Sequence, residues 1–154
     1  MKSTSLSRLF AGRRFRWLPI ATLLVLLLTA PAVAATPGAQ VRVARQFLLA
    51  VLRADYAQAY ALLAPEVRRA VPPARFELAA RPLYQQGQQR GPTIDLYRLG
   101  LRLSETDQSR LFYAFMFRSD TATSIPQVQL DVTFRDSAAT QILEFRLLPA
   151  PVKR

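Results

Sequence analysis

One stretch of nine residues, from Arg110 to Arg118, constrains this chain more than any other. It reads Arg-Leu-Phe-Tyr-Ala-Phe-Met-Phe-Arg, so every position between the two arginines is apolar or aromatic. Because successive side chains of a strand point to opposite faces, a strand here would present apolar groups on both faces. Its four aromatic rings also bring together the largest apolar side chains of the chain. The stretch therefore predicts a strand at the centre of a sheet.

Helices are predicted before this strand. Apolar residues recur at three-and-four spacing from Gln40 to Leu52, which predicts an amphipathic helix that follows a short linker. Asp55 is placed to cap a second helix that begins at Tyr56. Pro65 either ends that helix or opens another turn, and Pro73 suits the first turn of a further helix.

After residue 91 the periodicity changes from helical to two. Leucines at positions 99, 101 and 103 form one inward face, and the opposite phase of Ile94 and Leu96 predicts a bulge near Tyr97. Residues 127–135 alternate with one polar face, and residues 143–147 form a last strand. Helices followed by four such strands predict an α+β fold, in which N-terminal helices pack on a curved antiparallel four-stranded meander.

The inward faces predict a register for this meander, because a slip of one residue would turn every apolar set outward. The expected pairs are Leu101 with Tyr113, Phe115 with Leu130, and Leu130 with Phe145.

The other face of the sheet would carry a mixture of charged and apolar side chains. We expect Asp131 and Glu144 to oppose each other there and to be neutralised by Arg135 or Arg146. Phe112 and Met116 also lie on this face and are too apolar for a solvated surface, so another segment of the chain or a second subunit should cover them. The candidate partner-binding residues on this face are Arg98, Arg102, Phe112 and Met116.

The first 35 residues are typical of a secretory signal peptide. Basic residues precede an apolar run of 14 residues from Trp17 to Ala30, and small residues follow at 32–34. Cleavage near Ala34 or Ala35 would release an exported protein, periplasmic or secreted. It would consist of a linker over 36–39, a single domain over 40–148 and a tail over 149–154. The alternative is an uncut leader anchored in the inner membrane, although the run is shorter than the roughly 20 residues that span a bilayer. Only an uncut leader would make the membrane a partner.

Nearly half of the net charge of +11 lies in this leader. It holds five of the 21 basic residues and none of the ten acidic ones, so the remaining chain has a charge of +6 (16 minus 10). These charges are scattered, and no nucleic-acid-binding motif accompanies them. We therefore expect no nucleic-acid partner.

The composition also excludes several chemistries. The chain has no Cys and no His, so disulfides, thiol catalysis, Ser/His/Asp triads and Cys- or His-ligated metals are impossible. Its five glycines form no loop that would cradle a phosphate. We expect no cofactor, no metal and no catalytic residues.

Over nearly all of residues 40–148 the chain resembles the nuclear transport factor 2-like superfamily, the cystatin-like α+β cones. The residues that carry the resemblance are 44–52, followed by Asp55-Tyr56-Ala57-Gln58-Ala59-Tyr60-Ala61-Leu62-Leu63: a helix, a short break with Asp, and an Ala-Tyr-x-Leu-Leu helix. The resemblance implies a cone with a cavity between sheet and helices, used for catalysis in some members and for binding or assembly in many. Enzymatic members place a His or a carboxylate in that cavity, and this chain has no His.

A cavity of this kind would be lined by Tyr56, Tyr60, Phe76 and Tyr113. No carboxylate points into it by pattern, so the first expectation is an exported, non-catalytic binding or assembly module. Its partner would be a second copy bound through the outer sheet face or a protein of the cell envelope. The alternative is a carrier of a small apolar ligand, or an isomerase-like enzyme in which a carboxylate and a tyrosine exchange a proton.

Overall fold

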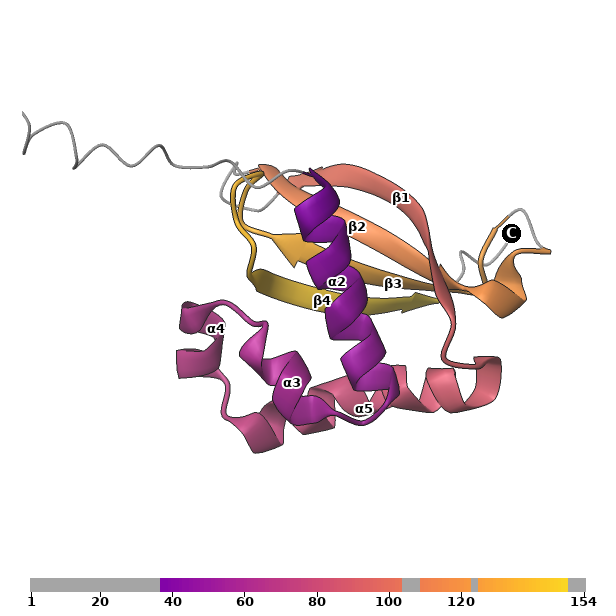
Figure 1. Cartoon of the computed structure of the whole chain (residues 1–154), viewed down its shortest axis with the longest axis horizontal. Coiled ribbons are helices and arrows are strands. Elements are labelled where there is room, and N and C mark those ends of the chain that lie inside the picture. The colour runs from indigo at the N-terminus through magenta and orange to yellow at the C-terminus, as the bar shows by residue number, and fades with distance from the viewer. Residues whose placement is uncertain (1–36, 104–108, 123–124, 150–154) are drawn as a thin grey trace, which may run out of the picture. The chain divides into compact units, whose positions relative to one another are not determined.

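The computed structural model describes residues 37–103, 109–122 and 125–149, and they form an α+β fold. The helices are α2 (Pro37–Leu52), α3 (Tyr56–Ala61), α4 (Pro65–Ala70) and α5 (Pro73–Arg90). The strands are β1 (Ile94–Leu103), β2 (Ser109–Phe117), β3 (Val128–Phe134) and β4 (Ile142–Pro149), with a short 3₁₀ turn at Arg118–Asp120 after β2. Helices pack against one antiparallel sheet, with α2 lying across it (Figure 1), so the predicted fold class is confirmed. The predicted leader and most of the predicted tail lie outside the described residues.

The helix boundaries follow local capping chemistry. The Asp55 carboxylate accepts a hydrogen bond from the Gln58 amide at 3.1 Å, which confirms it as the cap of α3. Pro65 opens α4, and Pro73 opens α5 as predicted. The first helix begins at Pro37, so most of the predicted linker is helical. A proline fits there because the first turn of a helix does not use its amide in helical hydrogen bonds.

The sheet has the order β1-β2-β3-β4, which confirms the Arg110–Arg118 stretch as an interior strand. The predicted bulge is also confirmed, because the β1–β2 register shifts between Leu96 and Arg98. Phe115 pairs with Leu130 as predicted.

Two predicted pairs are wrong by two residues. Leu101 pairs with Leu111 instead of Tyr113, and Leu130 pairs with Leu147 instead of Phe145. A shift of two keeps every side chain on its predicted face, because the side-chain period of a strand is two. Hydrophobic alternation therefore predicts the face and leaves the register open in steps of two.

The core lies between α2 and the middle of the sheet. Its fully buried members include Phe47, Leu48 and Val51 from α2 and Tyr113, Phe115, Leu130 and Val132 from β2 and β3. Leu99, Leu101 and Leu103 share the inward face but are 61%, 69% and 76% exposed, so their predicted place in the core is wrong. The reason is the position of α2, because most of β1 lies to one side of this helix (Figure 1).

A candidate ligand-binding groove

An apolar groove of about 510 Å³ lies between β4 and the helices α4 and α5. Its volume falls in the range of roughly 300–1,000 Å³ that is usual for small-molecule sites. Apart from Glu144, every residue that lines it is apolar: Leu63, Val67, Val71, Phe76, Ala79, Pro82, Leu83, Leu143, Phe145 and Leu147. The odd-numbered positions of β4 supply one wall, and positions 76, 79 and 83 of α5 supply the other with helical spacing.

An aromatic cluster forms the base of the groove. The ring of Phe76 lies 5.8 Å from that of Phe145 and 6.2 Å from that of Phe47, and the latter two rings are 5.3 Å apart. The ring of Tyr60 packs against the ring of Phe76, with 5.6 Å between the two ring centres. These separations are those of attractive tilted and edge-to-face pairs, so the cluster holds the base in a fixed shape.

The far wall depends on a contact between residues distant in sequence. The amide of Ala64 donates to the Ile142 carbonyl at 2.8 Å, and the amide of Ile142 donates to the Leu62 carbonyl at 3.0 Å. This short parallel bridge fastens the α3–α4 junction to the start of β4. It brings Leu63, Val67 and Val71, which we did not predict as cavity residues, to the groove. No local pattern in the sequence indicates such a pairing.

Glu144 is the charged residue of the lining. It pairs in register with Thr133 on the outer face of the sheet, and its carboxylate accepts a hydrogen bond from Arg146 Nε at 2.5 Å. This carboxylate is half-buried and already ion-paired with Arg146. The groove is therefore suited to hold apolar groups and lacks an acid–base pair among its described lining residues.

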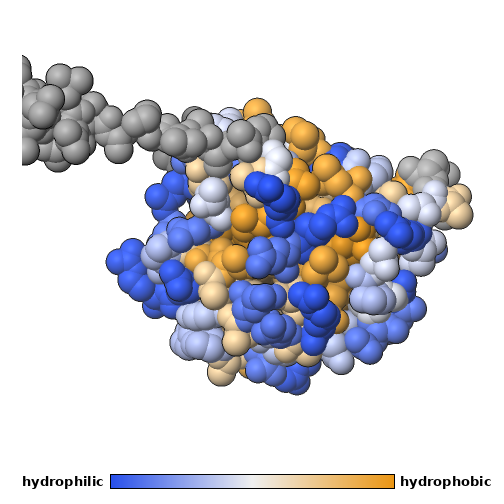
Figure 2. All heavy atoms as spheres, viewed as in Figure 1, coloured by the Kyte–Doolittle hydropathy of each residue, from blue (hydrophilic) through white to orange (hydrophobic). Residues whose placement is uncertain are grey.

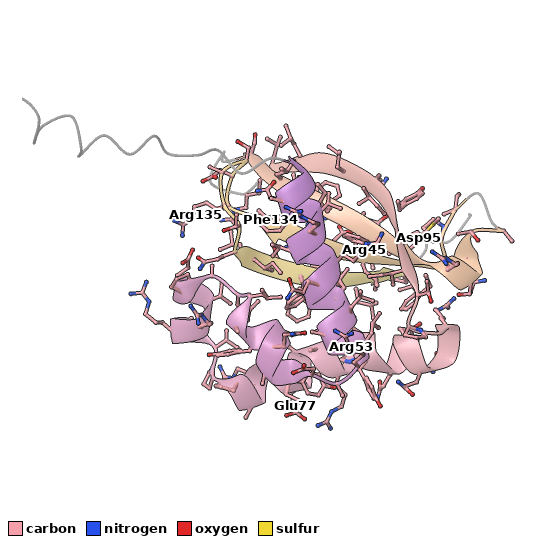
Figure 3. The ribbon with its side chains drawn as sticks, viewed as in Figure 1. Arg45, Arg53, Glu77, Asp95, Phe134 and Arg135 are labelled. Carbon is pink, nitrogen blue, oxygen red and sulfur yellow. The ribbon has the colours of Figure 1, made fainter. Side chains whose placement is uncertain are left out.

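The structure brings together three of the four predicted cavity residues. Phe76 lines the groove, and Tyr56, Tyr60 and Phe76 together line an adjacent hollow of about 450 Å³ beside Glu77. Figure 3 shows Glu77 on the side of α5 that faces away from the sheet. The Tyr60 hydroxyl donates to the end of α4, where it lies 2.8 Å from the carbonyl oxygens of Arg68 and of the capping residue Val71. Burial, followed by the charge of Glu77, raises the pKa of Tyr56 above 10, so this phenol is protonated at neutral pH.

Tyr113 lies elsewhere, so the prediction that it lines the cavity is wrong. Its hydroxyl donates to the Gln40 side-chain oxygen at 3.0 Å, inside the core. The Gln40 amide in turn donates to the carbonyls of Asp136 and Ala139 at 2.8 and 2.6 Å. Burial raises the pKa of Tyr113. Gln40 thus joins Tyr113 to the turn after β3, and Tyr113 is buried and not accessible to a ligand.

The four predicted partner-surface residues do share the outer face of the sheet. Arg98 donates to Gln129 at 2.9 Å. Arg102 donates to Asp131 at 2.6 Å while its guanidinium lies 4.8 Å from the centre of the Phe112 ring, a cation–π distance. Met116 is half-buried opposite Gln129. The arginines thus cover part of the apolar surface that we expected another segment or subunit to cover.

The predicted pairing of the acidic residues is confirmed for Glu144, which Arg146 binds, but Asp131 and Glu144 do not oppose each other. Asp131 lies opposite Arg146 in the register, yet its carboxylate is bound by Arg102, and Arg146 binds Glu144. Arg135 binds Glu66 of α4 instead of a residue of the sheet, and Figure 3 shows it pointing away from the sheet. Cross-strand position alone did not decide the partners, because Asp131 is bound by Arg102 from β1 although Arg146 lies opposite it.

Within residues 37–103, 109–122 and 125–149, no group of acidic side chains is arranged to hold a metal ion. Nor does any helix in these ranges have the length and apolarity needed to cross a bilayer. Comparisons with protein-family models, with curated proteins and with solved structures found no match. The lining of the groove is therefore the feature that indicates a function.

Proposed function

We propose that this protein is a non-catalytic binding module that takes a small apolar ligand into the groove between β4 and α4–α5. The observation that carries the proposal is a groove of about 510 Å³ whose lining is apolar except for Glu144. Transfer of apolar surface from water into such a lining is favourable and needs no specific polar contact. The ligand class is therefore an uncharged molecule with a large apolar part.

We also propose a relationship to the nuclear transport factor 2-like superfamily and export of the chain after removal of the leader. The order of helices and strands and a hollow between helices and sheet support the first. The basic region, apolar run and small residues at 32–34 support the second. Export would place the groove where it meets ligands of the cell envelope or the medium.

Filling the groove tests the binding proposal. Ala79 lines the groove and is exposed, so Ala79→Trp adds bulk to the site without entering the core. We expect the affinity of the exported protein for the uncharged fluorescent probe N-phenyl-1-naphthylamine, measured by fluorescence titration, to fall at least tenfold, while the thermal unfolding midpoint stays within a few degrees.

The matched control is Ala74→Trp, because Ala74 is an exposed alanine of the same helix that lines the adjacent hollow instead. Equal loss of affinity in both variants, or in neither, would contradict binding in the groove.

A further inference from the structure

A stripe of exposed leucines runs along β1. Leu96, Leu99, Leu101 and Leu103 are 40%, 61%, 69% and 76% exposed, and they lie on the same face as the buried residues Tyr113 and Phe115 of β2. Figure 2 shows apolar side chains gathered beside α2, over the part of the sheet that contains β1 in Figure 1. Contiguous apolar surface of this kind marks an interaction site more often than a solvated face.

The stripe lies on an edge strand. Within the described residues, β1 forms its ladder with β2 alone, and it is ten residues long. Natural edge strands are commonly protected by charges that face inward, by prolines, by bulges or by short length. The bulge of β1 lies between Leu96 and Arg98, and residues 98–103 beyond it pair in unbroken register. The two arginines of β1 do not protect this edge, because Arg98 and Arg102 reach across the sheet to Gln129 and Asp131 on β3. The free edge is therefore able to receive another strand.

Backbone geometry favours a strand over a lipid surface as the occupant. Each alternate residue of an edge strand directs its amide and carbonyl outward, and hydrocarbon offers these groups no hydrogen bonds. A further strand satisfies these groups and buries the leucines together, which is the strand-addition mode of recognition.

The sequence of β1 is complementary to itself. If two copies pair antiparallel about Leu101, the leucine of each copy at 101 meets its counterpart, and Leu99 meets Leu103 of the second copy. On the other face, Arg102 then meets Gly100 of the second copy, so no described arginine lies opposite another arginine. Pairing about Gly100 would place Arg98 against Arg102, and like charges directly opposite are destabilising.

We propose that two copies of this chain associate through their β1 edges, antiparallel about Leu101, and form one continuous sheet with a leucine ladder across a two-fold axis. An interface of this symmetry uses the same surface on both copies. The groove lies at β4, on the opposite edge of the sheet, and stays open in such a dimer. The proposal is therefore independent of the proposed function.

Single-cysteine cross-linking tests the two-fold axis directly, because the natural chain has no cysteine. In Leu101→Cys the two thiols would face each other, so mild oxidation of the exported protein should give a disulfide-linked dimer rapidly. A mixture of Leu99→Cys and Leu103→Cys should give more heterodimer than either variant gives homodimer. Leu78→Cys is the control, since Leu78 is 62% exposed on α5 and outside the stripe. Cross-linking of Leu101→Cys no faster than that of Leu78→Cys would overturn the proposal.

Sedimentation separates this interface from others. The exported protein should sediment as a dimer, and Leu101→Arg as a monomer with an unchanged circular dichroism spectrum, while Leu78→Arg stays dimeric. A monomeric natural protein would overturn the proposal. So would a dimer that survives Leu101→Arg, because another face would then hold it. Binding of a monomer to phosphatidylglycerol vesicles that Leu101→Arg abolishes would assign the stripe to lipid and would also overturn it.

Discussion

Asp95 and Arg118 form an ion pair that joins the start of β1 to the end of β2. Two nitrogens of the guanidinium each donate to one carboxylate oxygen at 3.0 Å, and the Arg118 amide donates to the Thr93 carbonyl at 2.9 Å. The side-chain hydrogen bonds from Arg118 lower the pKa of Asp95 below its ordinary value near 4. Because the folded-state pKa is the lower one, the pair stabilises the fold above about pH 4 and this contribution is lost as the pH falls through the folded value.

We therefore expect Arg118→Gln to lower the urea midpoint at pH 6 and to differ much less from the natural protein at pH 3. Equilibrium urea unfolding at both pH values measures this. Arg81→Gln is the matched control, because Arg81 is an exposed arginine whose ion pair lies within one helix. An equal deficit of Arg118→Gln at pH 6 and pH 3 would show that the arginine acts through packing and not through the charge of Asp95.

Residue identity alone did not predict which arginine binds Asp131. The buried carboxylate of Asp131 belongs to the outer face as predicted, and yet its partner comes from β1, two strands away. That choice depends on the packing of Arg102 over Phe112, which brings the guanidinium to the middle of the sheet. The alternation of apolar and polar residues does not indicate how far an arginine side chain extends across the sheet.

Helix starts and the strand bulge were predicted correctly where a few neighbouring residues determine them. The cap at Asp55, the proline starts of α4 and α5 and the bulge at Tyr97 each follow from a few neighbouring residues. The groove was not predictable in detail, because its far wall depends on the bridge between Leu63 and Ile142. The exposure of the β1 leucines was missed for the same reason, since it depends on where α2 crosses the sheet.

Gly100 shows how two strands fit at one position. It lies directly opposite Phe112, and a Cβ atom there would come within 2.8 Å of the phenyl ring. We expect Gly100→Val to destabilise the protein by roughly 1–3 kcal/mol through overpacking, measured by urea unfolding.

The double variant Gly100→Val/Phe112→Leu should lose less than the sum of the two single variants, because the smaller side chain removes the clash. Strict additivity would contradict a contact between these two positions.

At the scale of the whole molecule, the sheet has two edges with different surfaces. The β4 edge borders the apolar groove, and the β1 edge carries the exposed leucines. Separate edges allow a ligand and a second copy to bind at the same time. The two proposals therefore make separate predictions for the same protein.

Methyl chemical-shift mapping tests binding in the groove most directly. The protein without its predicted leader, labelled at leucine and valine methyls, is titrated with the uncharged probe N-phenyl-1-naphthylamine. We predict shifts for groove methyls, such as those of Val71, Leu83 and Leu147, and none for Leu78 or Leu101. Shifts confined to Leu101 and its neighbours on β1, or no shift at saturating probe, would contradict the account.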